Sequence, residues 1–132
     1  MNIQLSISML VSDRMETLGK CLASLKPLLM ELDSELIVIF TGKNEETLEL
    51  VQQYTPHIIP FTWCDDFSKA RNAGLKEAKG EWFLYLDNDE WFEDTSEIIQ
   101  FFKSGNISST NLHFIFSTII WILRVNVFPM EM

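Results

Sequence analysis

The chain has 132 residues and a formal net charge of −9. This length is enough for one domain with a hydrophobic core and too short for two. The excess of acids argues against a nucleic-acid backbone as partner and against adsorption to an anionic membrane. A small anionic ligand would need a metal ion to offset the charge repulsion.

The two cysteines, Cys21 and Cys64, lack metal-ligand spacing, and the amino terminus has no basic region ahead of an apolar one. These features support neither a disulfide framework nor a signal peptide. We therefore expect a cytoplasmic protein, either free or peripheral at the inner membrane face. His57 and His113 lie far apart in sequence and are interpreted as structural or exposed residues.

Strand and helix alternate along the first hundred residues. Apolar residues alternate with mostly polar ones over residues 5–11, which predicts a strand. Leu36–Phe40 is a second short apolar run. Between them, apolar residues recur every three or four positions and predict a helix that Pro27 kinks or ends: Met15, Leu18, Leu22, Leu25 and Leu29.

The pattern continues after the second strand. Asn44 can cap a helix that carries Leu48, Val51 and Tyr54, and Ile58–Phe61 is a short third strand weakened by Pro60. Asp65 or Asp66 can cap a further helix that runs through Lys79, with Gly80 as its C-terminal stop. This order predicts an α/β fold with a mainly parallel sheet and flanking helices.

The segment Trp82–Asp89 reads as a strand buried on both faces that ends in two carboxylates, Asp87 and Asp89. Side chains alternate along a strand, so both carboxylates would lie on one side and could share a divalent cation. From Glu81 to Glu97 the chain has seven acids and no Lys or Arg, which favours a cation. A solvated turn is the alternative interpretation. Parallel sheets bind ligands at the carboxyl ends of their strands, where this pair falls.

Three blocks together resemble the amino-terminal half of a family 2 glycosyltransferase with the Rossmann-like GT-A fold, over Leu5–Asp94. The blocks are Ile7–Leu25, Trp63–Gly74 with its Ala70-Arg71-Asn72 core, and Gly80–Glu90. The resemblance is strongest to bacterial enzymes that build lipopolysaccharide cores and other surface polysaccharides. It implies a nucleotide-sugar donor and a saccharide or lipid-linked saccharide acceptor.

The resemblance assigns roles to single positions. Asp87-Asn88-Asp89 matches the family's DxD element, so Asp89 would ligate Mg²⁺ or Mn²⁺, and Asp87 would lie near the ribose or the metal. Arg71 would face the nucleotide, and the alternative is a structural pair with Asp65 or Asp66. We assign structural roles to the other residues of the middle block. Ala73 and Gly74 are expected to allow close helix packing, and Trp63 and Phe67 are expected to lie in the core.

Two positions depart from the family's pattern. Phe40 stands where the family usually has an Asp that contacts the nucleotide, and phenylalanine accepts no hydrogen bond. Asp13-Arg14 stands where the most similar relatives have Asn-Glu. These differences leave the identity of the donor open.

The tail, residues 106–132, has only Arg124 and Glu131 as charged residues. We therefore divide the chain into a donor-binding half-domain, residues 1–105, and an apolar tail. Leu112–Phe128 is rich in β-branched and aromatic residues, which favours strand pairing or a homo-oligomer interface. A short membrane helix is the alternative.

The catalytic residues remain unassigned, because the family's base would come from beyond residue 105. Glu90, Glu93 and Asp94 are interpreted as a solvated face. A competing hypothesis is a catalytically inactive remnant or self-associating module with the same fold, which Phe40 and the missing half favour. An unrelated Rossmann-like nucleotide binder is disfavoured, because no Gly-rich loop follows the first strand.

Overall fold

The computed structural model describes residues 3–87, 91–92, 95–103 and 121–124. In chain order its elements are β1 (Leu5–Val11), α1 (Leu18–Glu31), β2 (Ser34–Phe40), α2 (Glu45–Gln52), β3 (Ile58–Pro60), α3 (Phe67–Glu77), β4 (Trp82–Asp87), α4 (Ser96–Lys103) and β5 (Trp121–Arg124). The strands form one sheet in the order β3-β2-β1-β4-β5. β1 to β4 pair in parallel, and β5 pairs antiparallel with β4. The predicted α/β fold is confirmed.

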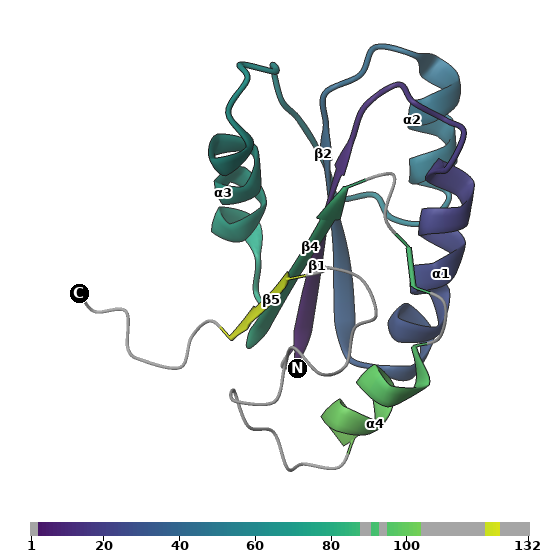
Figure 1. Ribbon diagram of the computed structural model, residues 1–132, viewed down its shortest axis with the longest axis vertical. Helices are drawn as coiled ribbons and strands as arrows, with labels where there is room; N and C mark the ends of the chain where they lie inside the picture. Colours follow the sequence, from purple (N-terminus) through teal and green to yellow (C-terminus); the bar gives the residue numbers. More distant parts are fainter. Residues whose placement is uncertain (1–2, 88–90, 93–94, 104–120, 125–132) are drawn as a thin grey trace, which may run out of the picture.

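The helices form a layer on each face of the sheet (Figure 1). α1 and α2 cover one face, α4 packs beside α1, and α3 is the one helix of the described residues on the other face. The larger core lies under α1 and α2 and includes Ile98 and Phe102 of α4. A smaller core lies under α3 and is centred on Ile37, Ile39 and Ala70.

β1 runs through the centre of the sheet and has a different chemistry on each face. The side chains that face α1 are large and fully buried: Leu5, Ile7, Met9 and Val11. The alternate positions Ser6 and Ser8 are small and also buried. This alternation follows from the two-residue period of a strand. The small residues let the connection from α3 to β4 approach β1 closely.

The sequence left open whether Pro27 kinks or ends the first helix. In the structure α1 continues past Pro27 to Glu31, so the proline does not end it. Proline costs one backbone hydrogen bond inside a helix. The leucine stripe offsets this cost, since Leu25 and Leu28 on either side of Pro27 are fully buried in the larger core.

The predicted helix starts and the weak third strand are confirmed. The side chain of Asn44 accepts a hydrogen bond from the Glu46 N–H at 2.8 Å, and Asp66 accepts from the N–H groups of Ser68 and Lys69. β3 has only three residues and lies at the sheet edge, where Pro60 removes no hydrogen bond from an interior strand.

Gly80 is not the helix stop predicted from the sequence, because α3 already ends at Glu77 with Ala78 as its cap. Instead, backbone N–H groups of the connection between α3 and β4 donate hydrogen bonds to side chains of β1 and β2. The Gly80 N–H donates to Ser6 Oγ at 2.7 Å, and the Lys79 N–H donates to Glu35 Oε2 at 2.8 Å. Ser6 Oγ in turn donates to Glu35 Oε2. This network fixes the start of β4 beside β1.

The tail contributes β5, which confirms strand pairing for Trp121–Arg124. The rest of Leu112–Phe128 lies outside the described residues, so the oligomer interface stays a prediction, as does the boundary at residue 105. α4 was not predicted. Its position is fixed partly by an ion pair between Lys103 Nζ and Glu31 Oε1 at 2.9 Å.

We predict that Gly80→Ala lowers the free energy of unfolding by about 1–3 kcal/mol, because overpacking forces the backbone apart. A methyl group at Gly80 would lie 2.7 Å from the Ser6 backbone nitrogen and 2.8 Å from Ser6 Oγ. Urea denaturation followed by circular dichroism measures the change.

Gly19→Ala is the matched control, since a methyl group there meets nothing within 4 Å. Alanine in place of this helical glycine should raise stability by up to about 1 kcal/mol. Equal effects of the two substitutions would show that the close approach at Gly80 is unimportant.

Candidate donor-binding site

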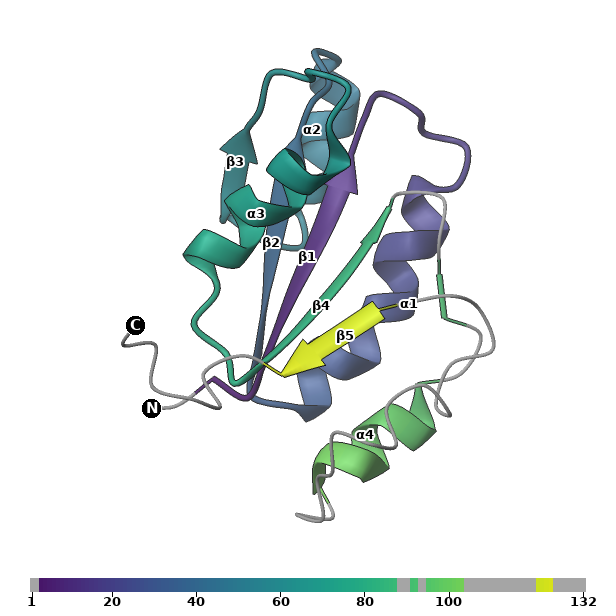
Figure 2. The same cartoon turned by 60° about the vertical axis from the view of Figure 1, so that its left-hand side comes forward.

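The carboxyl ends of three parallel strands meet at one edge of the sheet, which we call the ligand edge. In the register of the sheet, Val11 at the end of β1 lies beside Phe40 at the end of β2. Leu10 lies beside Asp87, the last residue of β4. Figure 2 shows that the arrowheads of β1 and β4 point to the same end of the sheet. This is the edge at which open parallel sheets bind ligands.

Asp87 is at the predicted place, at the end of β4 on the ligand edge. Its predicted partner Asp89 lies outside the described residues, as do Glu90, Glu93 and Asp94. Among the residues that the structure does describe, no three His, Cys, Asp or Glu side chains form a metal-binding group. The metal assignment for Asp87 and Asp89 therefore stays a prediction.

Arg71 projects from α3 to the ligand edge. Its guanidinium carbon Cζ lies 4.0 Å from the centroid of the Tyr85 ring, two residues before Asp87 in β4. Such a cation–π contact contributes about 0.5–1 kcal/mol when exposed and more when desolvated. It keeps a positive charge near the end of β4, so Arg71 and Asp87 belong to the same region.

The alternative role of Arg71, an ion pair with Asp65 or Asp66, is wrong for this structure. Within the described residues Arg71 makes no ion pair with either acid. Asp66 instead caps α3, and Asp65 Oδ1 accepts a hydrogen bond from Trp63 Nε1 at 3.1 Å. Both carboxylates serve the loop before α3, which leaves the guanidinium of Arg71 to Tyr85.

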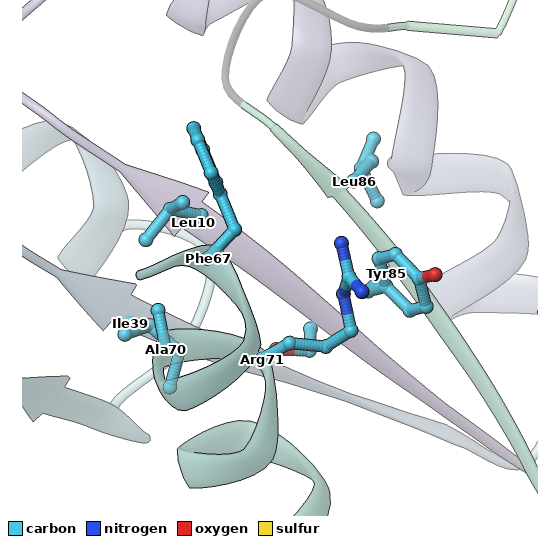
Figure 3. A pocket seen from close by; sticks show the side chains of 8 residues that line it. Leu10, Ile39, Phe67, Ala70, Arg71, Tyr85 and Leu86 are labelled. Atoms are coloured by element: carbon cyan, nitrogen blue, oxygen red, sulfur yellow. The ribbon is translucent and has the colours of Figure 1, made fainter. Parts of the chain in front are cut away.

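A shallow, partly open hollow with a volume of about 20 Å³ lies between α3 and the ligand ends of β1 and β4 (Figure 3). Phe67 and the Arg71–Tyr85 pair stand on opposite sides of it, and the apolar side chains of Leu10, Ile39 and Ala70 lie along its base. The close packing predicted for Gly74 is confirmed, since a methyl group there would overlap Ser8 Oγ of β1. This packing brings α3 near enough for the hollow to be lined by both elements.

Trp63 and Phe67 are not core residues, contrary to the sequence interpretation. Their exposed fractions are 38% and 55%. The physical reason is their location. Trp63 lies in the loop between β3 and α3, and Phe67 is the first residue of α3, whereas the buried residues of this helix, Ala70 and Gly74, lie further along it. An aromatic residue in a sequence block predicts burial only if an element packs against it.

A carboxylate clamp at the ligand edge was not predicted from the sequence. Asp13, in the loop after β1, accepts hydrogen bonds from the N–H groups of Lys43 and Asn44 before α2, at 2.8 Å and 2.9 Å for the shortest contacts. These bonds, that of Lys43 first, hold the pKa of Asp13 below its ordinary value of 3.8. Gly42 is required beside it, because a methyl group would overlap the Asp13 carboxylate.

The clamp gives a structural role to Asp13, one of the residues that depart from the family's pattern. Phe40, the other departure, ends β2 half-buried and packs against the larger core. Its side chain therefore contributes to folding at a position where the resemblance implies a polar contact.

Comparisons with known proteins identify the family. The model of the family described as "Glycosyl transferase family 2" matches residues 6–119 of the chain. The chain belongs to glycosyl transferase family 2. A TPR repeat-containing protein of Synechococcus elongatus is 39% identical over 103 residues, which cover 74% of this chain and 25% of that protein. The chain thus spans about a quarter of the length of this curated relative.

Solved structures share the fold. The mannosyltransferase PcManGT of Pyrobaculum calidifontis, in complex with GDP-Man and Mn²⁺, aligns with a TM-score of 0.61 at 14% identity, over 78% of this chain and 32% of its own. S. aureus TarS aligns with a TM-score of 0.54 at 22% identity, over 77% of this chain and 20% of its own. A shorter TarS chain in complex with UDP gives 0.51 at 21% identity, over 77% and 32%. At these identities the alignments show the GT-A fold, of which this chain is the amino-terminal half.

The helices in the described part of the chain are all too short or too polar to cross a membrane. Most of the apolar run at Leu112–Phe128 falls outside that part.

We predict that Asp13→Asn lowers the free energy of unfolding at neutral pH. The variant's stability should also fall less than that of the unmodified chain when the pH is lowered. Because the folded-state pKa lies below the ordinary value, the carboxylate stabilises the folded chain above about pH 4 and loses this effect as the pH falls through the folded-state pKa. Urea midpoints of both proteins at pH 7 and pH 3 measure the difference.

Glu49→Gln, which neutralises an exposed acid on α2, provides the control for charge alone. Asp13→Asn and Glu49→Gln should differ clearly at pH 7, and the difference should be smaller at pH 3, below the ordinary pKa of 3.8. The same shift for both variants at pH 7 would contradict the clamp.

Proposed function

We propose that this chain forms the donor-binding half of a glycosyltransferase that uses a nucleotide sugar and a divalent cation. The sugar would pass to a saccharide or lipid-linked saccharide acceptor in the synthesis of surface polysaccharide or lipopolysaccharide. The observation that carries the proposal is the position of Arg71, whose guanidinium lies over Tyr85 beside the end of β4. In a family 2 chain, a cation near the end of β4 supports the assignment of Asp87-Asn88-Asp89, which follows from the resemblance, as the DxD segment of the donor site.

The charge of the chain explains why that cation matters. A nucleoside diphosphate is an anion, and the chain has a net charge of −9. The planar guanidinium of arginine is permanently charged and suits phosphate oxygens, which it can bind with two parallel hydrogen bonds. Arg71 thus supplies one positive charge to the donor site. Because the segment after β4 is strongly acidic, a second positive charge, that of a divalent cation, would be needed there to bind the diphosphate.

The chemistry of Asp87 and Asp89 fits Mg²⁺ or Mn²⁺, because both ions prefer hard oxygen ligands. A bound divalent ion would offset the negative charge that develops on the departing diphosphate. Among the solved structures that share the fold, one is a complex with GDP-Man and Mn²⁺ and another is a complex with UDP. These complexes support a nucleotide donor and a metal for this chain.

The acceptor side of the reaction is not assigned to any described residue. Transfer needs an acceptor hydroxyl in line with the anomeric carbon and a base within hydrogen-bond reach. The described residues at the ligand edge provide donor-side groups alone. Phe40 favours the second candidate function, a non-catalytic module with the same fold, since its half-buried side chain packs against the core where the resemblance implies a polar contact.

We predict that Mn²⁺ or Mg²⁺ strengthens the binding of a nucleoside diphosphate by about tenfold or more, as expected for one charge-assisted contact. Asp89→Asn should abolish this metal dependence, because it removes a hard anionic ligand. Isothermal titration calorimetry with UDP and GDP, with and without the ion, gives the affinities.

Asp33→Asn is the matched control, because it makes the same charge change at an exposed residue between α1 and β2, at the opposite sheet edge. It should leave the metal dependence intact. Nucleotide affinities that are equal with and without metal in the unmodified chain would contradict the proposal.

A further inference from the structure

Two aromatic side chains stand exposed where the chain enters α3. Trp63 and Phe67 pack edge to face, with ring centroids 4.9 Å apart and an interplanar angle of 72°. Among the described residues, the only other large hydrophobic side chain with comparable exposure is Met30 on α1. Exposed aromatic rings forgo the stabilisation of burial. Their position at the ligand edge therefore calls for a functional explanation.

The backbone next to Trp63 is arranged to hold its ring in place. Asp65 has a φ of 58°, the left-handed region that non-glycine residues seldom adopt. In this conformation Asp65 Oδ1 accepts the hydrogen bond of Trp63 Nε1 at 3.1 Å. Strained residues of this kind concentrate at binding sites, where they fix a surface before the ligand arrives. The strain at Asp65 thus orients an exposed ring and not a core residue.

The hollow beside these rings has the chemistry for a flat anionic molecule. Phe67 forms one side, and the Arg71 guanidinium lies against Tyr85 on the other (Figure 3). The remaining lining is mostly aliphatic, with Ser8 as its one further polar side chain. Such a lining offers π faces and a cation, but it has few groups that could form hydrogen bonds with the edge of a ligand's ring.

We propose that Phe67, supported by Trp63, forms a stacking surface for the base of the nucleotide donor. This inference rests on the proposed function and adds which part of the donor the β3–α3 loop binds. A base has two π faces, so it can stack on an aromatic ring and also on an arginine plane. A saccharide offers no such face to the guanidinium. The diphosphate of the same molecule then extends toward the end of β4.

Recognition by stacking has a consequence for specificity. Every base presents a π face, so stacking discriminates little between one base and another. The site should accept uracil and purine nucleotides with similar affinity, and both should depend on Phe67 to a similar degree.

The test compares Phe67→Leu and Phe67→Tyr with the unmodified chain in calorimetric titrations at a fixed Mg²⁺ concentration. The probes are UDP, ADP and methylenediphosphonate, which has a diphosphate-like group and no base. Phe67→Leu should weaken UDP and ADP by about tenfold or more. It should leave methylenediphosphonate unchanged, whereas Phe67→Tyr should retain the nucleotide affinity. Met30→Leu is the matched control on an exposed apolar residue, and it should change none of the affinities.

The outcomes separate this inference from the proposed function. If Phe67→Leu leaves UDP and ADP affinities unchanged, or weakens methylenediphosphonate equally, the stacking surface is wrong while donor binding stands. If the unmodified chain binds neither nucleotide nor methylenediphosphonate, the proposed function itself fails.

Discussion

The close approach of α3 and its exit loop to β1 is the constraint on which the donor site depends. It is possible because β1 presents Ser6 and Ser8 to this face, while the opposite face carries large buried side chains. Gly74 and Gly80 lie directly against these serines, where no methyl group fits. A layer of larger side chains here would lift α3 away from the sheet. The Arg71 guanidinium would then no longer reach the Tyr85 ring.

From this packing the chemistry of the ligand edge follows step by step. α3 delivers a cation to the end of β4, and its first turn places Phe67 across the hollow. The Asp13 clamp ties the loop after β1 to the start of α2 through two backbone N–H groups. Loops at the edge are thereby held by interactions that do not require a ligand. A preorganised site of this kind loses less entropy when it binds.

The sequence predicted the sheet well because hydrophobic periodicity reports the burial of each face. Helix caps at Asn44 and Asp66 were also visible, since capping is local chemistry. The role of Gly80, the clamp at Asp13 and the exposure of Trp63 were not predictable in this way. Each depends on which segment lies opposite, and that information appears only when the chain has folded. Arg71 could be assigned to the site by resemblance, but its partner Tyr85 required the structure.

The central claim is that a metal and a nucleotide bind together at the ligand edge. Amide NMR spectra of the ¹⁵N-labelled chain with UDP, titrated with Mn²⁺, test it directly because the paramagnetic ion broadens nearby signals. Leu10 and Tyr85, at the ligand edge, should broaden first, while Gln4 and Asp33 at the opposite edge, where the Gln4 N–H bonds the Asp33 carbonyl, should stay sharp. Broadening centred on Gln4 and Asp33, or spread evenly over the sheet, would contradict the account.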